Sequence, residues 1–413
     1  MQQTALDWLI SVDDHVLEPP DLWQKRLPVR YRDVGPRIAT DDRGEAWFFE
    51  DLRSPTPAIV TSAGREAEQL SPLPTTYAEM RPGCYDPLAR VEDMNRDGVL
   101  ASLCFPSFPR FCGQAFTEAK DKVLGLLCVQ AYNDWMLEDW CGAAPGRFIP
   151  LMIIPLWDPQ LAVTEIERTA AKGGRAIAFS ENPYPLGLPS IHDKSRYWDP
   201  VFAAAADHEM PLCTHLGSSS QLPQTSPSTP LIATMSLTPL NIAACCIDWL
   251  FSGILPRFPN LKICLSEGGI GWIPYVLERC DYVVEKQKRW ASDSDWELDW
   301  STGETKPIPG STGLQLDELH PSQLFREHMY GCFIDEAHGA SCIDEIGADN
   351  VMIETDYPHG DTTYPNSLAI ARRSLAKWDP ETQHKVVRGN AERVFRFTPA
   401  EPPEVTRVSV DPE

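Results

Sequence analysis

The chain has 413 residues, and a hydrophobic share of 43% is enough to build a large buried core, which excludes a wholly disordered protein. The formal net charge is −23, with 36 basic against 59 acidic residues, and such a surface repels phosphate groups. Nucleic acids and anionic membranes are therefore not expected as partners.

The N-terminal residues and the cysteines indicate a cytoplasmic protein. No run of about 18 apolar residues indicates a transmembrane helix, and the first residues lack the pattern of a signal peptide. The 12 cysteines follow no zinc-binding spacing, and Cys104, Cys213, Cys264 and Cys332 lie inside apolar runs. We expect buried, reduced thiols.

Short apolar runs recur along the chain and end in polar or glycine residues. They cover residues 10–15, 101–106, 149–154, 176–180, 211–215, 262–267, 330–334 and 351–356. Most are separated by segments with helical periodicity, at 121–140, 160–171, 241–251, 272–285 and 338–346. Apolar strands alternating with helices are typical of βαβ units and a parallel sheet. Eight such strands predict an α/β fold of the closed (β/α)8 type, a TIM barrel.

Two stretches interrupt this alternation, at about 19–90 after strand one and about 292–325 after strand six. Both are rich in aromatic residues, which favours lids or partner surfaces over disordered loops. The tryptophans at 23, 47, 296 and 300 fit either an assembly interface or core packing. We expect one barrel domain over residues 1–400, with a terminal helix at 381–397, and an acidic tail at 401–413.

The predicted strands end in residues that bind metals. Asp13 and His15 are two positions apart, so their side chains point to the same side of strand one, and Asp14 points to the other. Strands five, six and eight end at His215, Glu267 and Asp356. The carboxyl ends of barrel strands form the active-site face, so these groups are expected to meet there.

Each residue also has a plainer interpretation. A single histidine such as His215 is more often a hydrogen-bonded structural residue, and Glu267 could cap the helix that follows it. Asp356 could cap a turn, and Glu18 could be a loop carboxylate. Separate structural roles would not, however, collect acids and imidazoles at the same end of four strands, so we favour a metal site.

The order of these motifs resembles the amidohydrolase superfamily, in particular the amidohydrolase-related group that includes 2-amino-3-carboxymuconate semialdehyde decarboxylase and the resorcylate decarboxylases. The matching segments are residues 12–19, 179–183, 213–215, 265–272, 354–359 and the closing 389–395. The resemblance implies that Asp13 and His15 form the first-strand metal pair. It further implies that His215 and Asp356 are the ligands on strands five and eight.

The sequence departs from this group at two positions. Many members have His-x-His, Glu-x-Ala or Glu-x-His on strand one, where this chain has Asp-x-His. The decarboxylases usually have a catalytic histidine after strand six, where this chain has Glu267, and Glu18 is an additional acid near the first pair. A ligand set of Asp13, His15, Glu18, His215, Glu267 and Asp356 suits one or two divalent ions of Fe, Mn or Zn.

Three functions fit these observations. The first is a metal-dependent hydrolase or decarboxylase of a small organic acid or amide, with Asp356, Glu267 and His359 as catalytic groups. The second is a dinuclear Fe or Mn monooxygenase that acts on a small molecule with O2. The third is a non-catalytic barrel subunit. The resemblance also implies a homo-oligomer, or a hetero-oligomer with a homologous barrel. Arg110, after strand two, is a candidate for binding a substrate carboxylate, or a surface ion pair.

Overall fold

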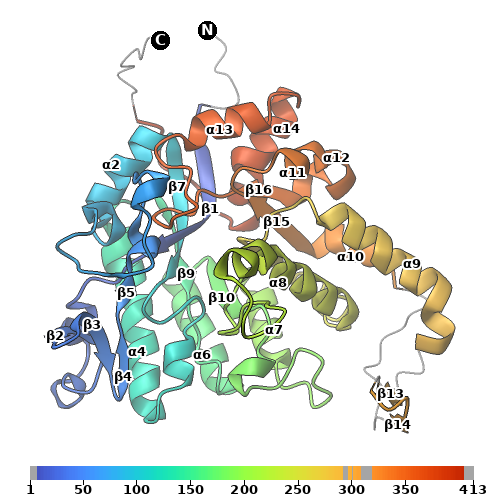
Figure 1. The fold of residues 1–413 in the computed structure, drawn as a ribbon, viewed down its shortest axis with the longest axis horizontal. Coiled ribbons are helices and arrows are strands. Elements are labelled where there is room, and N and C mark those ends of the chain that lie inside the picture. Colours follow the sequence, from blue (N-terminus) through green and yellow to red (C-terminus); the bar gives the residue numbers. More distant parts are fainter. Residues whose placement is uncertain (1–6, 292–295, 300, 308–318, 404–413) are drawn as a thin grey trace.

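The structure, a computed structural model, describes residues 7–291, 296–299, 301–307 and 319–403 (Figure 1). Its centre is a ring of parallel strands. These are β1 (Leu9–Val16), β7 (Val99–Pro106), β8 (Phe148–Ile149), β9 (Leu151–Met152), β10 (Ala176–Ser180), β11 (Leu212–His215), β12 (Ile263–Ser266), β15 (Met329–Phe333) and β16 (Val351–Ile353). Pro150 separates β8 from β9 and has no N–H to donate, so these two pieces count as one strand of the barrel.

The strands pair side by side in the order β1-β7-β8 and β9-β10-β11-β12-β15-β16. Every pair in this ring is parallel. Two backbone hydrogen bonds link β1 to the segment directly after β16, from Asp356 N to Asp13 O at 3.0 Å and from His15 N to Tyr357 O at 2.7 Å. These bonds complete the ring, and the TIM-barrel prediction is confirmed.

Helices surround the barrel, and several begin where the sequence supplies a cap. Asp86, Asp121 and Asp158 each accept two backbone N–H groups at the start of α2, α4 and α6, which satisfies donors that the first helical turn leaves free. The larger helices are α2 (Pro87–Asp97), α4 (Lys122–Trp135), α6 (Pro159–Ala171), α7 (Asp199–Asp207), α8 (Leu231–Phe251), α9 (Ile273–Ala291), α10 (Pro321–His328) and α13 (Ser367–Ser374). The shorter ones are α3 (Gln114–Thr117), α5 (Cys141–Ala143), α11 (Ala337–Ser341), α12 (Ile343–Ile346), α14 (Pro380–His384) and α15 (Asn390–Val394).

The first insertion forms a small antiparallel sheet beside the barrel. It contains α1 (Leu22–Arg26), the sheet of β2 (Arg37–Asp41), β3 (Gly44–Phe49) and β4 (Leu52–Ser54), and the pair β5 (Thr56–Pro57) and β6 (Pro74–Thr75). Trp23 and Trp47 are buried and pack edge to face, and both contact Phe108 from the loop after β7. These two aromatic side chains therefore belong to the core that joins the insertion to the barrel.

The second insertion follows α9. Its described part includes β13 (Trp296–Leu298) and β14 (Thr305–Pro307), which lie beyond the end of α9 (Figure 1). Residues 300 and 308–318, and the predicted tail from 404 on, lie outside the described residues. The predicted terminal helix at 381–397 is divided into α14, a π-helix at Lys385–Gly389, and α15.

Helix α8 begins at Leu231, earlier than the predicted start at 241, and contains Pro239. Among the described residues it alone is long and apolar enough to cross a membrane by length and composition, with a mean hydropathy of 1.5. Core helices of soluble proteins also meet this criterion; 28% of the apolar window of α8 is buried, and Ile242 and Trp249 are among the buried residues of the helix. Ile232 and Leu240 of α8 are exposed.

Candidate metal centre

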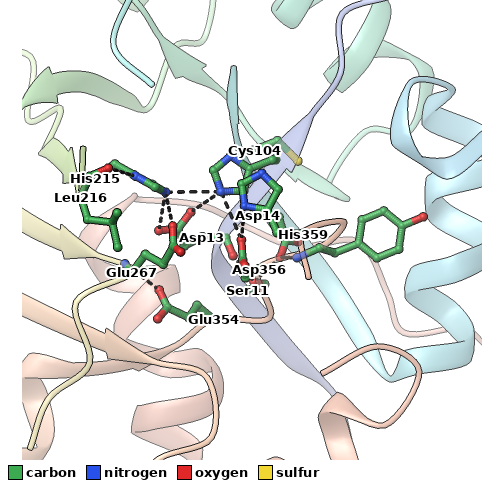
Figure 2. Close-up of polar contacts among 12 residues, drawn as sticks. Ser11, Asp13, Asp14, Cys104, His215, Leu216, Glu267, Glu354, Asp356 and His359 are labelled. Atoms are coloured by element: carbon green, nitrogen blue, oxygen red, sulfur yellow. Dashed lines mark hydrogen bonds and ion pairs between the residues drawn. The ribbon is translucent and has the colours of Figure 1, made fainter. Parts of the chain in front are cut away.

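Four strands bring the predicted ligands to one end of the barrel (Figure 2). Asp13 and His15 extend from β1, His215 ends β11, and Glu267 and Asp356 follow β12 and β16 directly or within three residues. Asp13, His15 and His215 have no exposed surface, and Asp356 has 1%. The strand ends meet here because all strands of the ring run in the same direction.

The two histidines face each other through their Nε2 atoms, which are 3.3 Å apart. Asp13 lies 3.7 Å from each of these nitrogens. A Glu267 oxygen is 2.8 Å from His215 Nε2, and an Asp356 oxygen is 3.2 Å from His15 Nε2. Two imidazole nitrogens and three carboxylates therefore surround one small volume.

The polar atoms of this cluster lack hydrogen bonds that would account for their burial. Both carboxylate oxygens of Asp13 and of Asp356 are buried without a hydrogen-bond partner, as is His15 Nδ1. An unpaired buried carboxylate is costly, and the usual compensation is a paired charge or a metal ion. The donor set of carboxylate oxygens and imidazole nitrogens fits a divalent cation such as Mn, Fe or Zn.

Both histidines are in a form that can bind a metal ion. His215 Nδ1 is 2.7 Å from the carbonyl oxygen of Leu216, so we assign the proton to Nδ1 and the lone pair to Nε2. Burial lowers the pKa of His15 well below its usual value, and the neighbouring His359 and His215 lower it further. His15 is therefore neutral at physiological pH, the form in which histidine binds metals.

The pKa of Asp13 is shifted in the opposite direction to that of His15. Burial raises its pKa well above the usual value, and the negative charges of Glu354, Glu267 and Asp356 raise it further. A cation at this position would reverse that effect because it favours the ionised carboxylates.

His359 is held at the edge of the cluster. Its ring stacks on His15, with centroids 3.6 Å apart, and its Nδ1 lies 3.0 Å from Asp356 Oδ1. Burial opposes the charged imidazole, but Asp356 and Glu267 outweigh that effect and raise the pKa of His359 above its usual value. His359 is therefore biased toward carrying a proton.

Two of the site residues have strained backbones. Glu267 has φ 53° and Asp356 has φ 52°, in the left-handed region that residues other than glycine seldom adopt. Such a conformation costs on the order of 1–3 kcal/mol and concentrates at functional sites. It turns the chain sharply at the end of β12 and after β16, where these two carboxylates face the histidines.

Asp14 points away from the cluster, as the strand alternation predicted. It accepts hydrogen bonds from Ser11 and Thr355 side chains, from the Ser102 hydroxyl and from the Tyr357 backbone N–H. These donors come from β1, β7 and the segment after β16, so this buried carboxylate joins the strands on both sides of Asp13 and His15.

The sequence interpretation missed a second buried pair. Cys332 on β15 donates to Glu354 Oε2 at 2.6 Å, and Glu267 N donates to the same oxygen at 3.2 Å. Burial raises the pKa of Glu354 to about 8. Glu354 directly follows β16, so the occurrence of acidic residues at strand ends was a signal for it.

Two predicted site residues lie elsewhere. The carboxylate of Glu18 accepts the backbone N–H groups of Ser107 and Phe108 at 3.0 and 2.9 Å, and it is absent from the groups of described residues able to share one metal ion. The guanidinium of Arg110 is paired with Glu118 and also donates to the Ser220 hydroxyl at 2.8 Å. Glu18 thus supports a loop, and Arg110 is engaged at the surface.

The barrel and this site together define a metal-dependent enzyme of the amidohydrolase type. Residues 22–397 match the family model described as amidohydrolase, and the chain belongs to that family. It is therefore a metal-dependent hydrolase or carbon–carbon lyase.

Individual relatives are distant. The chain is 23% identical over 291 residues to a γ-resorcylate decarboxylase from Polaromonas, which covers 64% of this chain and 75% of that protein. The structure of an amidohydrolase from Mycobacterium avium subsp. paratuberculosis aligns with a TM-score of 0.69 and 20% identity, over 96% of this chain and 100% of the other. A dihydroxybenzoic acid decarboxylase from Polaromonas, solved with bound manganese and the inhibitor 2-nitroresorcinol, aligns with a TM-score of 0.58 and 17% identity, over 97% of this chain and 100% of the other. At these identities the structural matches support the fold.

Proposed function

We propose that the protein is a metal-dependent decarboxylase of a small carboxylic acid. The observation that carries this proposal is the burial of Asp13, whose two carboxylate oxygens have no hydrogen-bond partner, beside the Nε2 atoms of His15 and His215, with Asp356 3.2 Å from His15 Nε2. The decarboxylase relative adds support for the reaction type.

Asp13, His15, His215 and Asp356 would hold the divalent cation, with Glu267 as a further carboxylate beside it. When bound, such a cation supplies a Lewis acid that orients and polarises a carboxylate. The protein holds the two nitrogens and the carboxylates in place before substrate arrives, because their backbones belong to hydrogen-bonded strands or lie next to them.

Decarboxylation also needs a proton. The bond between the substrate carbon and its carboxylate breaks, CO2 leaves, and the electron pair that remains on carbon must take up one proton. His359 is the group that we assign to this transfer, because Asp356 engages Nδ1 and favours the protonated ring. His359 then regains its proton from solvent. Glu267, whose side chain is 18% exposed, is a further carboxyl group within reach of the site.

The other two interpretations have less support. The relatives reported above include no oxygenase, and a non-catalytic subunit would have no need for the buried Asp13 carboxylate without a hydrogen-bond partner or for strain at Glu267 and Asp356. No separate observation supports the oxygenase or the non-catalytic subunit.

The test uses purified protein stripped of metal and reloaded with Mn²⁺ or Zn²⁺. We expect metal-dependent CO2 release from members of a panel of small carboxylic acids. His359→Gln should retain the metal and lose at least a hundredfold in rate, whereas His192→Gln, a change at a histidine paired with Asp248 outside the site, should not. Failure to bind a divalent metal would refute the proposal. Metal-dependent O2 consumption without CO2 release would replace it with the oxygenase.

A further inference from the structure

A cavity of ≈ 130 Å³ lies between the first insertion and the barrel mouth. His359 forms part of its wall and stacks on His15, so the cavity borders the proposed catalytic site. The other lining residues come from three segments: Leu17 and Glu18 after β1; Trp47, Ser54, Pro55, Thr56, Pro57, Val60 and Tyr77 from the insertion; and Ser107, Phe108 and Phe111 after β7.

The wall of this cavity contains no lysine or arginine among the described residues. Its ionisable groups are Glu18, His359 and Tyr77. The Tyr77 hydroxyl donates to the backbone oxygen of Glu18 at 2.6 Å, and the Glu18 carboxylate is already bonded to two backbone N–H groups. His359 is directed to Asp356 through Nδ1. Apart from His359, no side chain here offers positive charge to an anion.

Aromatic rings form much of the rest. Trp47 stacks on Phe108 with ring centroids 4.7 Å apart, and Phe111 stacks on His215 at 4.0 Å. Phe111 thus contacts both the cavity and a predicted metal ligand. A dry cavity of roughly 150 Å³ accommodates a benzene molecule, so this cavity of ≈ 130 Å³ has room for no more than about one ring without bulky substituents.

We propose that this cavity receives the uncharged, ring-sized body of the substrate and selects against a second carboxylate. The inference rests on the proposed function, in which one carboxylate is used at the metal. A second carboxylate would lose its hydration in an aromatic wall and would lie near Glu18. The first insertion, which supplies Trp47 and Val60, therefore determines which acids the barrel accepts.

The experiment compares three probes by calorimetry on Mn²⁺-loaded and metal-free protein. Benzoate has one ring and one carboxylate, isophthalate has one ring and two, and phenol has a ring alone. We expect benzoate to bind the loaded protein at least tenfold more tightly than isophthalate does. Phenol should bind both the Mn²⁺-loaded and the metal-free protein. Val60→Trp, which fills the cavity, should weaken phenol binding at least tenfold.

A cation placed in the wall should reverse the preference. Val60→Lys should strengthen isophthalate binding at least tenfold, and Val60→Met, similar in length but uncharged, should not. Equal binding of benzoate and isophthalate by the unchanged protein, or phenol binding that Val60→Trp leaves unaltered, would overturn this inference. Benzoate binding that is the same with and without Mn²⁺ would instead count against the proposed function, while the phenol result would still decide the cavity.

Discussion

Glu18 offers a quantitative test of the structure because its burial makes folding depend on pH. The side chain has no exposed surface, and burial raises its pKa from 4.5 to about 7, although the N–H groups of Phe108 and Ser107 partly offset that effect. In the unfolded chain the carboxyl ionises near its ordinary value. The folded state therefore holds its proton more tightly, and the associated stability is complete at low pH and is lost as pH rises through 7.

Glu18→Gln replaces the protonated acid with an amide of the same shape that cannot ionise. One pKa unit corresponds to about 1.4 kcal/mol, so a rise of about 2.5 units sets an upper bound of about 3 kcal/mol on the pH-dependent loss in the unchanged protein. Glu18→Gln does not undergo this pH-dependent loss of folding stability. Its stability relative to the unchanged protein should therefore improve by up to about 3 kcal/mol between pH 5 and pH 8.

Urea unfolding at several pH values measures this difference, and thermal melts provide a second readout. For a chain of 413 residues, the average unfolding entropy converts about 3 kcal/mol into a shift of roughly 3 °C. Glu167→Gln, the same change at an exposed glutamate of α6, is the control and should give a difference that does not change with pH. A flat difference for Glu18→Gln, or one that falls as pH rises, would refute the reasoning. The metal content of the Glu18→Gln variant should equal that of the unchanged protein, since Glu18 lies outside the metal-binding groups.

Three further predictions concern the metal centre and its support. His215→Ala and Asp356→Ala should each lose metal by elemental analysis while circular dichroism remains that of a folded protein; normal metal content in both would place the site elsewhere. Gly268→Ala should weaken metal binding because its Cβ would lie 2.5 Å from Ile242 Cγ2 and displace the adjacent strained turn, and Ile242→Ala in the same chain should restore part of the affinity. Asp14→Asn should cost about 2–4 kcal/mol in urea unfolding, because an amide cannot accept all the hydrogen bonds that the carboxylate accepts; a loss under 1 kcal/mol would contradict its role in joining the strands.

The ring of strands was predictable because its strands are short, mainly apolar runs, and all of their residues are buried. Residues 10–15 were predicted and β1 spans Leu9–Val16; residues 176–180 were predicted and match β10. Once the strands are parallel, their carboxyl ends share one face, and the proximity of Asp13, His215 and Asp356 follows from topology alone. The fold, and the end of the barrel at which the candidate ligands lie, could therefore be predicted from the sequence.

Other features depend on contacts between distant segments. Glu18 is only three residues beyond His15, but its carboxylate is directed by the backbone of residues 107 and 108, which no local pattern specifies. The same applies to Phe111, whose stacking on His215 requires the turn after β7. Trp47 was open to two interpretations because an aromatic residue in an insertion looks the same in sequence whether it packs inward or outward.

The groups buried around the site predict one metal ion per chain. The carboxylates of Asp13, Glu267 and Asp356 face the histidines within one small volume. Glu354 lies near Asp13, where burial raises its pKa to about 8 and the Cys332 thiol donates to its Oε2.

A second divalent ion, held by Asp13, Cys332 and Glu354, would have to displace the proton with which Cys332 bonds to Glu354, and burial raises the pKa of this thiol well above its usual value. We therefore expect one equivalent of divalent metal per chain by elemental analysis, both as purified and after reconstitution with excess Mn²⁺. Glu354→Gln, which keeps the neutral side chain, should leave that value at one. Two equivalents in the unchanged protein, falling to one in Glu354→Gln, would show that Glu354 is an ionised ligand and would contradict this expectation.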